Sequence, residues 1–291
     1  MSEKFTVKEF NKKYPDDDAC LQEIFNHRYG HLKECPKCHK PTKFYKISGR
    51  KCYKCAFCGF ELRPLADTIF HKSSTSLKNW FFAIYLFANS KNGVSAKELQ
   101  RHLGVTYKCA WRMAKQIRLL FDNQDQDGTP LDGIVEADET YMGGKRRGKR
   151  GRGAEGKTPI IGVAERNGEV MAKVVNDTTS STITPFICKN VEKGTELMTD
   201  EYKSYKKISL QGYKHRTVNH GLNEYVNGTA HTNTLEGFWS QLKRSVNGTY
   251  HAISPKYLQN YLNEFVYRYN LRHSQAHLFH LIVPMAGKPV L

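Results

Sequence analysis

The first part of the chain carries apolar residues at helical spacing. From Leu77 to Asn89 they recur every three or four positions, which predicts a helix with one buried face. Ser95 and Glu98 have the spacing of a capping box and predict a short helix over residues 96–103. After a glycine-containing turn, a third, basic helix is expected over about 107–121. A short helix, a turn and a basic helix together outline a helix-turn-helix.

After residue 131 the pattern changes to short apolar runs separated by turn residues. Alternation and turn signals predict strands at residues 133–138, 160–165, 170–176, 196–199 and 215–218. Helical spacing predicts helices at residues 182–191, 202–210 and 233–246. Three strands followed by alternating helices and strands is the order of a ribonuclease-H-like α/β fold. In that fold the first and fourth strands are neighbours.

The cysteines predict a metal-binding module before these helices. The chain has 8 cysteines, and most of them lie within residues 35–58. Cys35 and Cys38 form one C-x-x-C knuckle and Cys55 and Cys58 a second, which predicts a zinc ribbon with one structural Zn²⁺. Cys52 forms a further C-x-x-C pair with Cys55 and is the alternative to Cys58. We favour Cys58, because the residues after it resemble those after Cys38. The remaining cysteines are expected in the core.

These patterns divide the chain at a polar stretch rich in Asp, Asn, Gln and Gly. The predicted parts are an N-terminal helical segment (1–30), the zinc ribbon (31–72), the helix-turn-helix (73–122), a linker (123–132), a ribonuclease-H-like catalytic domain (133–275) with a basic loop (143–158), and a C-terminal tail (276–291).

The charge of the chain indicates its partner. There are 45 Lys and Arg against 28 Asp and Glu, a net charge of +17. That excess predicts a polyanion, and we expect double-stranded DNA rather than a membrane surface. The alternatives are a charge that serves solubility and, for the three helices, a solvated basic face. The expected DNA-binding residues are Lys108, Arg112 and Lys115 of the third helix and Lys145, Arg146, Arg147, Lys149, Arg150 and Arg152 of the glycine-rich basic loop.

The sequence also predicts an intracellular location. It has no run of about 18 apolar residues, and its first residues lack the apolar stretch of a signal peptide. In a bacterium this means the cytoplasm, in association with the nucleoid. In a eukaryotic host it means the nucleus, and the basic loop would then be an alternative localisation signal.

Three acidic positions stand where the predicted elements begin or end. Asp138 ends the first strand, Asp200 follows the fourth, and Glu236 lies in the last helix. Two aspartates on strands and a glutamate on a helix can hold two divalent metals against a phosphodiester. Asn233, on nearly the same helix face as Glu236, is the alternative third member. Lys243 follows Glu236 by two helical turns, about 10 Å along the axis, and is expected to hold a phosphate.

Other polar and aromatic residues near these positions are expected to have roles outside the acidic site itself. Arg244 is expected to contact the DNA backbone. Glu136, Glu139 and Glu201 are expected to be solvated, and His231 to cap the helix or support a ligand. Phe238 and Trp239 are expected in the core, and His273, His277 and His280 at an exposed helix end.

Four separated blocks resemble the insertion-sequence DDE transposases that carry an N-terminal zinc ribbon, a group related to the eukaryotic Merlin transposases. The blocks are residues 138–145, 199–205, 231–244 and 261–270. The zinc knuckles and Thr68-Ile69-Phe70 also match, although the group usually has Gly where this chain has Asp67. The resemblance spans roughly residues 30–275.

The resemblance implies two Mg²⁺ or Mn²⁺ ions about 4 Å apart, with Asp138 shared and Asp200 and Glu236 each completing one site. It also implies a homodimer or a larger assembly. We therefore predict a DNA transposase that binds the terminal inverted repeats of its mobile element, cleaves the ends and transfers the 3′ ends to target DNA. The alternatives are a zinc-ribbon DNA-binding regulator and a ribonuclease-H-like nuclease without strand transfer.

Overall fold

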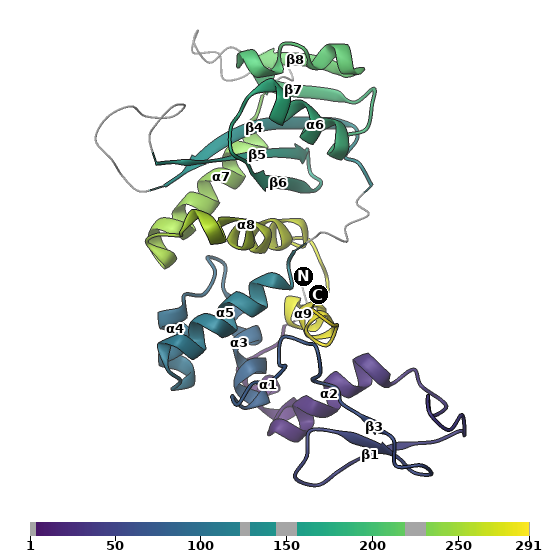
Figure 1. The fold of residues 1–291 in the computed structure, drawn as a ribbon. Coiled ribbons are helices and arrows are strands. Elements are labelled where there is room, and N and C mark those ends of the chain that lie inside the picture. Colours follow the sequence, from purple (N-terminus) through teal and green to yellow (C-terminus); the bar gives the residue numbers. More distant parts are fainter. Residues whose placement is uncertain (1–3, 123–128, 144–155, 219–230, 291) are drawn as a thin grey trace. The chain divides into compact units, whose positions relative to one another are not determined.

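The computed structural model describes residues 4–122, 129–143, 156–218 and 231–290 (Figure 1). The chain forms two compact units, Met1–Leu120 with His273–Leu291, and Phe121–Arg272. The first unit therefore takes residues from both ends of the sequence. In the described ranges, no helix has the length and apolar character needed to span a bilayer.

The first unit combines a small antiparallel sheet with helices. Its helices are α1 (Val7–Lys13), α2 (Asp17–Tyr29), α3 (Leu77–Asn89), α4 (Ala96–Leu103), α5 (Tyr107–Leu119) and α9 (Leu278–Ala286). Its strands, in the order β1-β2-β3, are β1 (Phe44–Lys46), β2 (Tyr53–Cys55) and β3 (Glu61–Leu62).

The predicted positions of helices α3, α4 and α5 are confirmed. Each helix starts directly after a residue whose side chain caps it. Ser76, Ser95 and Thr106 each accept a hydrogen bond from a backbone N–H of the first turn. Helix α4 ends at Gly104, whose φ of 63° is in the left-handed region. Helix α5 ends at Leu119, slightly before the expected end.

The residues expected as a C-terminal tail include helix α9, which completes the core of the first unit. Phe279 of α9 is fully buried. Its ring centroid lies 5.1 Å from that of Phe5, 5.6 Å from Tyr14 and 6.1 Å from Phe81. The apolar face of the tail is thus covered by residues near the start of the chain and by α3.

The second unit is built on a mixed sheet with the strand order β6-β5-β4-β7-β8. Its strands are β4 (Ile134–Met142), β5 (Thr158–Glu165), β6 (Val170–Val174), β7 (Glu196–Asp200) and β8 (Lys214–Val218), and its helices are α6 (Ser180–Asn190), α7 (Asn233–Ser245) and α8 (Pro255–Asn270). Strand β4 pairs antiparallel with β5 and parallel with β7, so the first and fourth strands of the unit are neighbours. This is the predicted ribonuclease-H-like arrangement.

Two elements of this unit differ from the prediction. Strand β4 does not end at Asp138, because its ladder with β5 continues to the pair of Met142 with Thr158. The helix expected over residues 202–210 is replaced by two short 3₁₀ turns, Lys203–Tyr205 and Ile208–Gln211. Tyr205 ends the first turn and Ile208 begins the second, and both are buried in the same apolar cluster.

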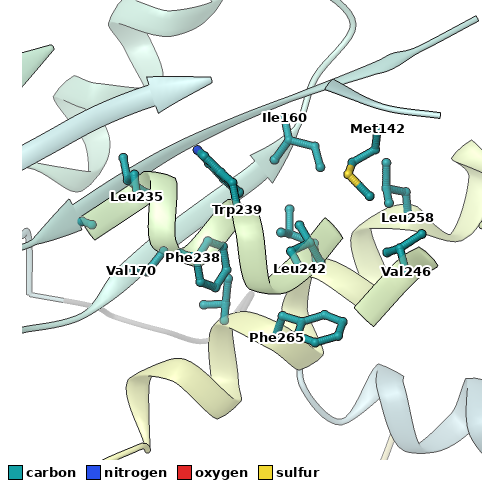
Figure 2. Packing of buried hydrophobic residues seen from close by; sticks show 13 residues of the cluster. Met142, Ile160, Val170, Leu235, Phe238, Trp239, Leu242, Val246, Leu258 and Phe265 are labelled. Atoms are coloured by element: carbon teal, nitrogen blue, oxygen red, sulfur yellow. The ribbon is translucent and has the colours of Figure 1, made fainter. Parts of the chain in front are cut away.

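The sheet is covered on both faces (Figure 1). Helices α7 and α8 cover one face, where Leu235, Phe238 and Leu242 of α7 share one apolar cluster with Ile160 of β5 (Figure 2). Helix α6 and the 3₁₀ turns cover the other face, with Tyr205 in that core. Because β4 is central and covered on both sides, few of its side chains reach solvent.

Candidate active site

Two aspartates come together just beyond the last parallel pair of strands β4 and β7. The register places Glu136 beside Met198, so two residues further along both strands Asp138 stands beside Asp200. The Oδ1 atom of Asp200 accepts a hydrogen bond of 3.0 Å from the N–H of Tyr202, an Asx turn that orients this carboxylate. The strand order predicted from the sequence is therefore what brings the two aspartates together.

Glu139 joins them in a compact acidic group. One carboxylate oxygen from each of Asp138, Glu139 and Asp200 lies within 4.8 Å of the others, so a metal ion could bind among them. Oε2 of Glu139 also accepts a hydrogen bond of 2.9 Å from the hydroxyl of Tyr205. Burial, followed by the charges of the three carboxylates, raises the pKa of Tyr205 well above its ordinary value, so the hydroxyl remains a donor.

The expectation that the acidic neighbours are solvated is wrong for two of them. Glu136 is 0% exposed and Glu139 8% exposed, whereas Glu201 is exposed. The predicted strand order could have indicated this burial, because it makes the first strand the central strand of the sheet. A central strand that is covered on both faces leaves no row of solvated positions.

Glu236 lies in the first turn of α7, near the side of the helix that contacts Asp138. Trp239, which touches Asp138, is three residues later, and residues three apart are neighbours on a helix surface. Oε1 of Glu236 accepts a hydrogen bond of 3.0 Å from Thr232. Its carboxylate is outside the 4.8 Å group. Asn233 is six residues before Trp239 and projects about 120° away from it around the helix, so the geometry favours Glu236.

Trp239 connects helix α7 directly to Asp138. Its Nε1 donates a hydrogen bond of 3.1 Å to Oδ2 of Asp138, while its ring lies in the apolar cluster shown in Figure 2. Gly162 of β5 pairs with Asp138, and a Cβ at Gly162 would lie 2.7 Å from the indole ring. The prediction that Trp239 is a core residue is confirmed, and the structure adds the contact with the carboxylate.

The electrostatics of the acidic group suit a bound cation. Burial raises the pKa of Asp138 to about 7, and the charges of Glu139, Asp200 and Glu236 contribute to the rise. A divalent cation would relieve this repulsion, and oxygen donors are the ligands that Mg²⁺ and Mn²⁺ prefer. The donor set therefore fits a hard divalent metal.

Lys243 extends the same side of α7 away from the acidic group. Burial lowers the pKa of its ammonium group, the charge of Asp138 raises it, and the charge of Lys157 lowers it again. The charges of Asp138 and Lys157 thus both act on Lys243, whose exposed side chain is available to contact a phosphate. Arg244, the next residue of α7, is exposed.

Arg166 and His231 contact the buried carboxylate of Glu136. Nε of Arg166 donates a hydrogen bond of 2.9 Å to Oε1 of Glu136, and Nδ1 of His231 lies 3.2 Å from the same oxygen. His231 thus lies against Glu136 and not against one of the predicted metal ligands, so its role as a helix cap or as support of a ligand stays a prediction. The contact of Arg166 was not foreseen, because in the sequence this residue only adjoins the Asn167-Gly168 turn.

The four cysteine sulfurs that lie within 4.8 Å of one another belong to Cys35, Cys38, Cys55 and Cys58. Cys52 is buried and stands outside this group. Four convergent thiol groups suit tetrahedral Zn²⁺, so the donor set fits this metal.

The two knuckles repeat the same backbone bonds. Sγ of Cys35 accepts a hydrogen bond of 3.4 Å from the N–H two residues later, and Sγ of Cys55 does the same. The N–H of Cys35 donates to the carbonyl of Lys40, and that of Cys55 to the carbonyl of Phe60, both at 3.0 Å. This repetition makes Cys58, and not Cys52, the counterpart of Cys38.

The predicted DNA-binding residues of α5 differ in their surroundings. Lys108 is exposed near the start of the helix. Arg112 donates a hydrogen bond of 3.1 Å to the carbonyl of His71, and Nζ of Lys115 lies 5.9 Å from the centroid of the Trp111 ring. These contacts leave Lys108 as the member of the set that extends most directly into solvent.

The start of α5 has two further candidates that the sequence did not indicate. Tyr107 is 46% exposed, and Nζ of Lys97 in α4 lies 4.9 Å from the centroid of its ring. An exposed aromatic ring with one lysine over its face is a suitable surface for a nucleic acid. This surface forms because α4 packs beside α5 and brings Lys97 to Tyr107. The spacing of residues along either helix alone does not predict that contact.

The basic loop residues Lys145, Arg146, Arg147, Lys149, Arg150 and Arg152 lie outside the described residues. The ends of the loop are described. A Cβ at Gly143 would lie 2.9 Å from the carbonyl oxygen of Gly156, so the backbone segments approach closely there. The two described ends of this segment therefore meet just beyond the end of β4, a few residues after Asp138.

Of the C-terminal histidines, His277 and His280 lie at helix α9, whereas His273 is exposed. Nδ1 of His277 accepts a hydrogen bond of 3.2 Å from the N–H of Phe279 at the start of that helix. The ring of Phe5 packs at 5.8 Å from His277 and 4.7 Å from His280. Within the described part of the chain, the groups that could hold a metal are the cysteine cluster and the acidic group.

Sequence comparison matches both modules to families. The family of the ISXO2-like transposase domain matches residues 130–270, and that of the transposase zinc-ribbon domain matches residues 15–61. The two matches together cover more than half of the chain. The second begins just before α2, whose Phe25 stacks on Tyr53 of the ribbon with 4.0 Å between ring centroids.

Individual relatives agree with these families. The chain is 28% identical over 256 residues to the "Uncharacterized protein in transposable element ISH50" of Halobacterium salinarum, covering 80% of this chain and 84% of that protein. It is 26% identical over 102 residues to an "Uncharacterized transposase-like protein" of Haemophilus influenzae, covering 35% of this chain and 81% of that protein.

Among solved structures, the Mos1 strand transfer complex aligns with a TM-score of 0.24 and 10% identity over 72% of this chain and 79% of that chain. A TM-score of this size does not by itself establish a shared fold. The strand order, the acidic group and the two family matches agree with one another. The chain belongs to the DDE transposases of insertion sequences that combine an N-terminal zinc ribbon with an ISXO2-like, ribonuclease-H-like catalytic domain.

Proposed function

We propose that this transposase binds the terminal inverted repeats of its own element, cleaves the DNA at these ends and transfers the 3′ ends to target DNA. The observation that carries the proposal is the position of Asp138 beside Asp200, with α7 bringing Glu236 toward them. Two divalent metals, when bound there, supply activation of the attacking oxygen and stabilisation of the leaving oxygen.

The residues of the site divide this task. Asp138 is the central carboxylate, held by Trp239, and would be shared between the two metals. Asp200, oriented by the Tyr202 N–H, and Glu236, on the first turn of α7, each complete one side. Mg²⁺ or Mn²⁺ suits these oxygen donors.

The basic residues position the DNA. Lys243 and Arg244 would hold the backbone near the cleaved end, and the loop residues after β4 would follow it further. Lys108 at the start of α5, with Arg112 and Lys115 along that helix, would contact the terminal repeat. In a helix-turn-helix the first residues of the second helix approach the base edges.

The zinc ribbon would hold one structural Zn²⁺ through Cys35, Cys38, Cys55 and Cys58. Its role is to stabilise the module that recognises DNA, because four protein ligands leave no open position for catalysis. Two DNA ends must be joined in one event, so we expect a homodimer or larger assembly. In a bacterial host the protein would act in the cytoplasm, at the nucleoid.

A paired substitution tests the proposed chemistry. Asp200→Ala should abolish cleavage of DNA carrying the inverted repeats of the element, and should leave binding of these ends unchanged. Glu201→Gln, at the exposed neighbouring position, is the matched control and should retain both activities. Retained cleavage in Asp200→Ala would reject the assigned site.

A second assay separates transposition from its rivals. With pre-cleaved ends and Mg²⁺, the protein should produce target DNA joined to the 3′ ends. Cut target DNA without joined products would instead indicate a nuclease. A DNA-binding regulator would bind the ends and leave all DNA intact, with Mg²⁺ or with Mn²⁺.

A further inference from the structure

We propose that Glu136 is a positioning residue that fixes the first turn of α7 against strand β4, so that Glu236 and Trp239 face Asp138. This inference rests on the proposed function of the acidic site. Oε2 of Glu136 accepts hydrogen bonds from the backbone N–H groups of Thr234 at 2.8 Å and of Leu235 at 3.2 Å. Oε1 accepts a third, of 2.9 Å, from the hydroxyl of Thr234. The strand therefore caps the helix.

The charge of Glu136 is balanced within the protein interior. The side chain is 0% exposed. Arg166 donates to its Oε1 through Nε at 2.9 Å and to the carbonyl of His231 through Nη2 at 3.0 Å. The positive end of the α7 dipole adds to this compensation, because the carboxylate lies at the helix N-terminus. One carboxylate thus connects β4, the end of β5 and the start of α7.

Capping alone does not require such a residue. Helices α4 and α5 are capped by local residues, Ser95 and Thr106, which need no buried charge. Helix α7 has no cap hydrogen bond from the side chain of its own Thr232. Burying an ion costs several kcal/mol unless it is well paired. What the carboxylate from β4 adds is a fixed position of α7 relative to the strand that carries Asp138.

The geometry transmits that position directly to the site. Glu136 and Asp138 are two residues apart on β4 and therefore lie on the same face of the strand. The two backbone donors that Glu136 binds are immediately before Glu236 in the first turn of α7. A shift of this turn would move Glu236 and Trp239 together relative to Asp138. Glu136 itself is not proposed to contact metal or DNA.

Binding of Mn²⁺ without DNA, measured by titration calorimetry, tests this role. Glu136→Gln keeps the shape of the side chain but removes its charge and one acceptor. We expect it to weaken Mn²⁺ binding about tenfold, the size seen when groups that orient metal ligands are changed. With saturating pre-cleaved ends, strand transfer should slow, while the affinity for the DNA ends should remain unchanged.

A double-mutant cycle distinguishes positioning from general destabilisation. If Glu136 acts through Glu236, then adding Glu136→Gln to Glu236→Gln should weaken Mn²⁺ binding little further. The matched control is Glu264→Gln. Glu264 is also 0% exposed and paired, at 2.9 Å, with Arg268, but both lie in α8. Below its unfolding temperature this variant should keep the Mn²⁺ affinity and the strand-transfer rate of the unchanged protein.

Two results would overturn the inference: equal effects of Glu136→Gln and Glu264→Gln on Mn²⁺ affinity, or additive effects of Glu136→Gln and Glu236→Gln. If Glu136→Gln does not fold, Arg166→Lys takes its place in the cycle, because it keeps the charge but cannot reach both Glu136 and His231. Failure of the proposed function would look different. In that case the unchanged protein would yield no joined products, whereas the Mn²⁺ cycle would still report on Glu136.

Discussion

At the scale of single residues, the surroundings of each carboxylate decide what it can do. Asp138 has a raised pKa and accepts a hydrogen bond from the indole of Trp239. Glu139, next to it in the chain, lies against the hydroxyl of Tyr205, on the other face of the strand. Glu136 is buried among donors at the start of α7. Three acidic residues within four positions of one strand therefore have three different environments.

The contact between Trp239 and Asp138 depends on the absence of a side chain at Gly162. In Gly162→Ala the new Cβ would lie 2.7 Å from the indole ring, so Trp239 must move away from Asp138. We expect the free energy of unfolding to fall by about 1–3 kcal/mol, and strand transfer to slow. Urea unfolding and the strand-transfer assay measure the two effects.

Gly237→Ala is the matched control for this substitution. Gly237 is inside α7, and a Cβ there would meet nothing within 4 Å. This variant should be more stable by up to about 1 kcal/mol, because alanine favours the helix. Strand transfer at the normal rate in Gly162→Ala would contradict the importance of the indole contact.

His215 predicts a pH dependence of stability. Burial lowers the pKa of His215 below its ordinary value of 6.5, and its Nε2 lies 2.9 Å from Oγ1 of Thr199. Because the pKa is lower in the folded than in the unfolded state, the unfolded chain binds the proton more tightly. Stability is therefore greatest above the ordinary pKa and is lost as the pH falls from there through the folded pKa.

Replacing His215 should remove this dependence. In urea unfolding, His215→Gln should lose less stability than the unchanged protein between about pH 7.5 and about pH 5.5. His251→Asn is the control, since His251 is exposed, in the same unit, and has a φ of 60° that asparagine tolerates. An equal loss of stability in His215→Gln and the unchanged protein would exclude His215 as the source.

At the scale of elements, local sequence signals were reliable wherever the element is stabilised within itself. Helices α3, α4 and α5 carry their own caps, and their predicted positions are confirmed. The zinc knuckles repeat one set of backbone bonds. The elements that differ, the end of β4 and the turns after β7, depend on partners distant in sequence. At Asp67 the φ of 61° lies in the left-handed region, where glycine is favoured.

The knuckle geometry predicts which cysteine binds zinc. Cys58→Ser should lower the zinc content, and Cys52→Ser, the matched control at a buried position outside the cluster, should retain one Zn²⁺ per chain. Atomic absorption on the purified proteins measures this content. Loss of a zinc ligand typically exposes the module to unfolding, so Cys58→Ser should also be cut faster by protease within the ribbon. If only Cys52→Ser lost zinc, the ligands would instead be Cys52 and Cys55, and Cys58 would not bind zinc.

At the scale of the whole molecule, the chain returns to its first unit after completing the second. Helix α9 follows the last helix of the catalytic unit in sequence but packs with α3 and α2 of the first. The first unit thus depends on residues from both ends of the chain. This arrangement predicts that damage at the C-terminus affects the first unit, which holds the zinc ribbon and helices α3, α4 and α5.

Phe279→Ala tests this dependence. Phe279 is fully buried among aromatic side chains of the first unit, so its truncation should destabilise that unit by about 3–5 kcal/mol. Hydrogen exchange should show faster exchange in α1 and α3 and unchanged exchange in the sheet of the second unit. Lys288→Ala, at an exposed position after the helix, is the control. Equal exchange in α3 of Phe279→Ala and the unchanged protein would contradict the assignment of α9 to the first unit.

The sequence by itself predicted the five strands of the second unit, the helices α3, α4 and α5, the zinc knuckles, and Asp138, Asp200 and Glu236 as the acidic positions of the site. These follow from local periodicity, caps and spacing, which depend on residues close together in the chain. Only the tertiary structure decided that Glu136 and Glu139 are buried, that Trp239 holds Asp138, and that α9 joins the first unit. The physical reason is that each of these facts depends on contacts between segments far apart in sequence. A glutamate exposed to solvent and a glutamate buried at a helix N-terminus look the same in the sequence. Only the packing of distant segments shows which environment each one has.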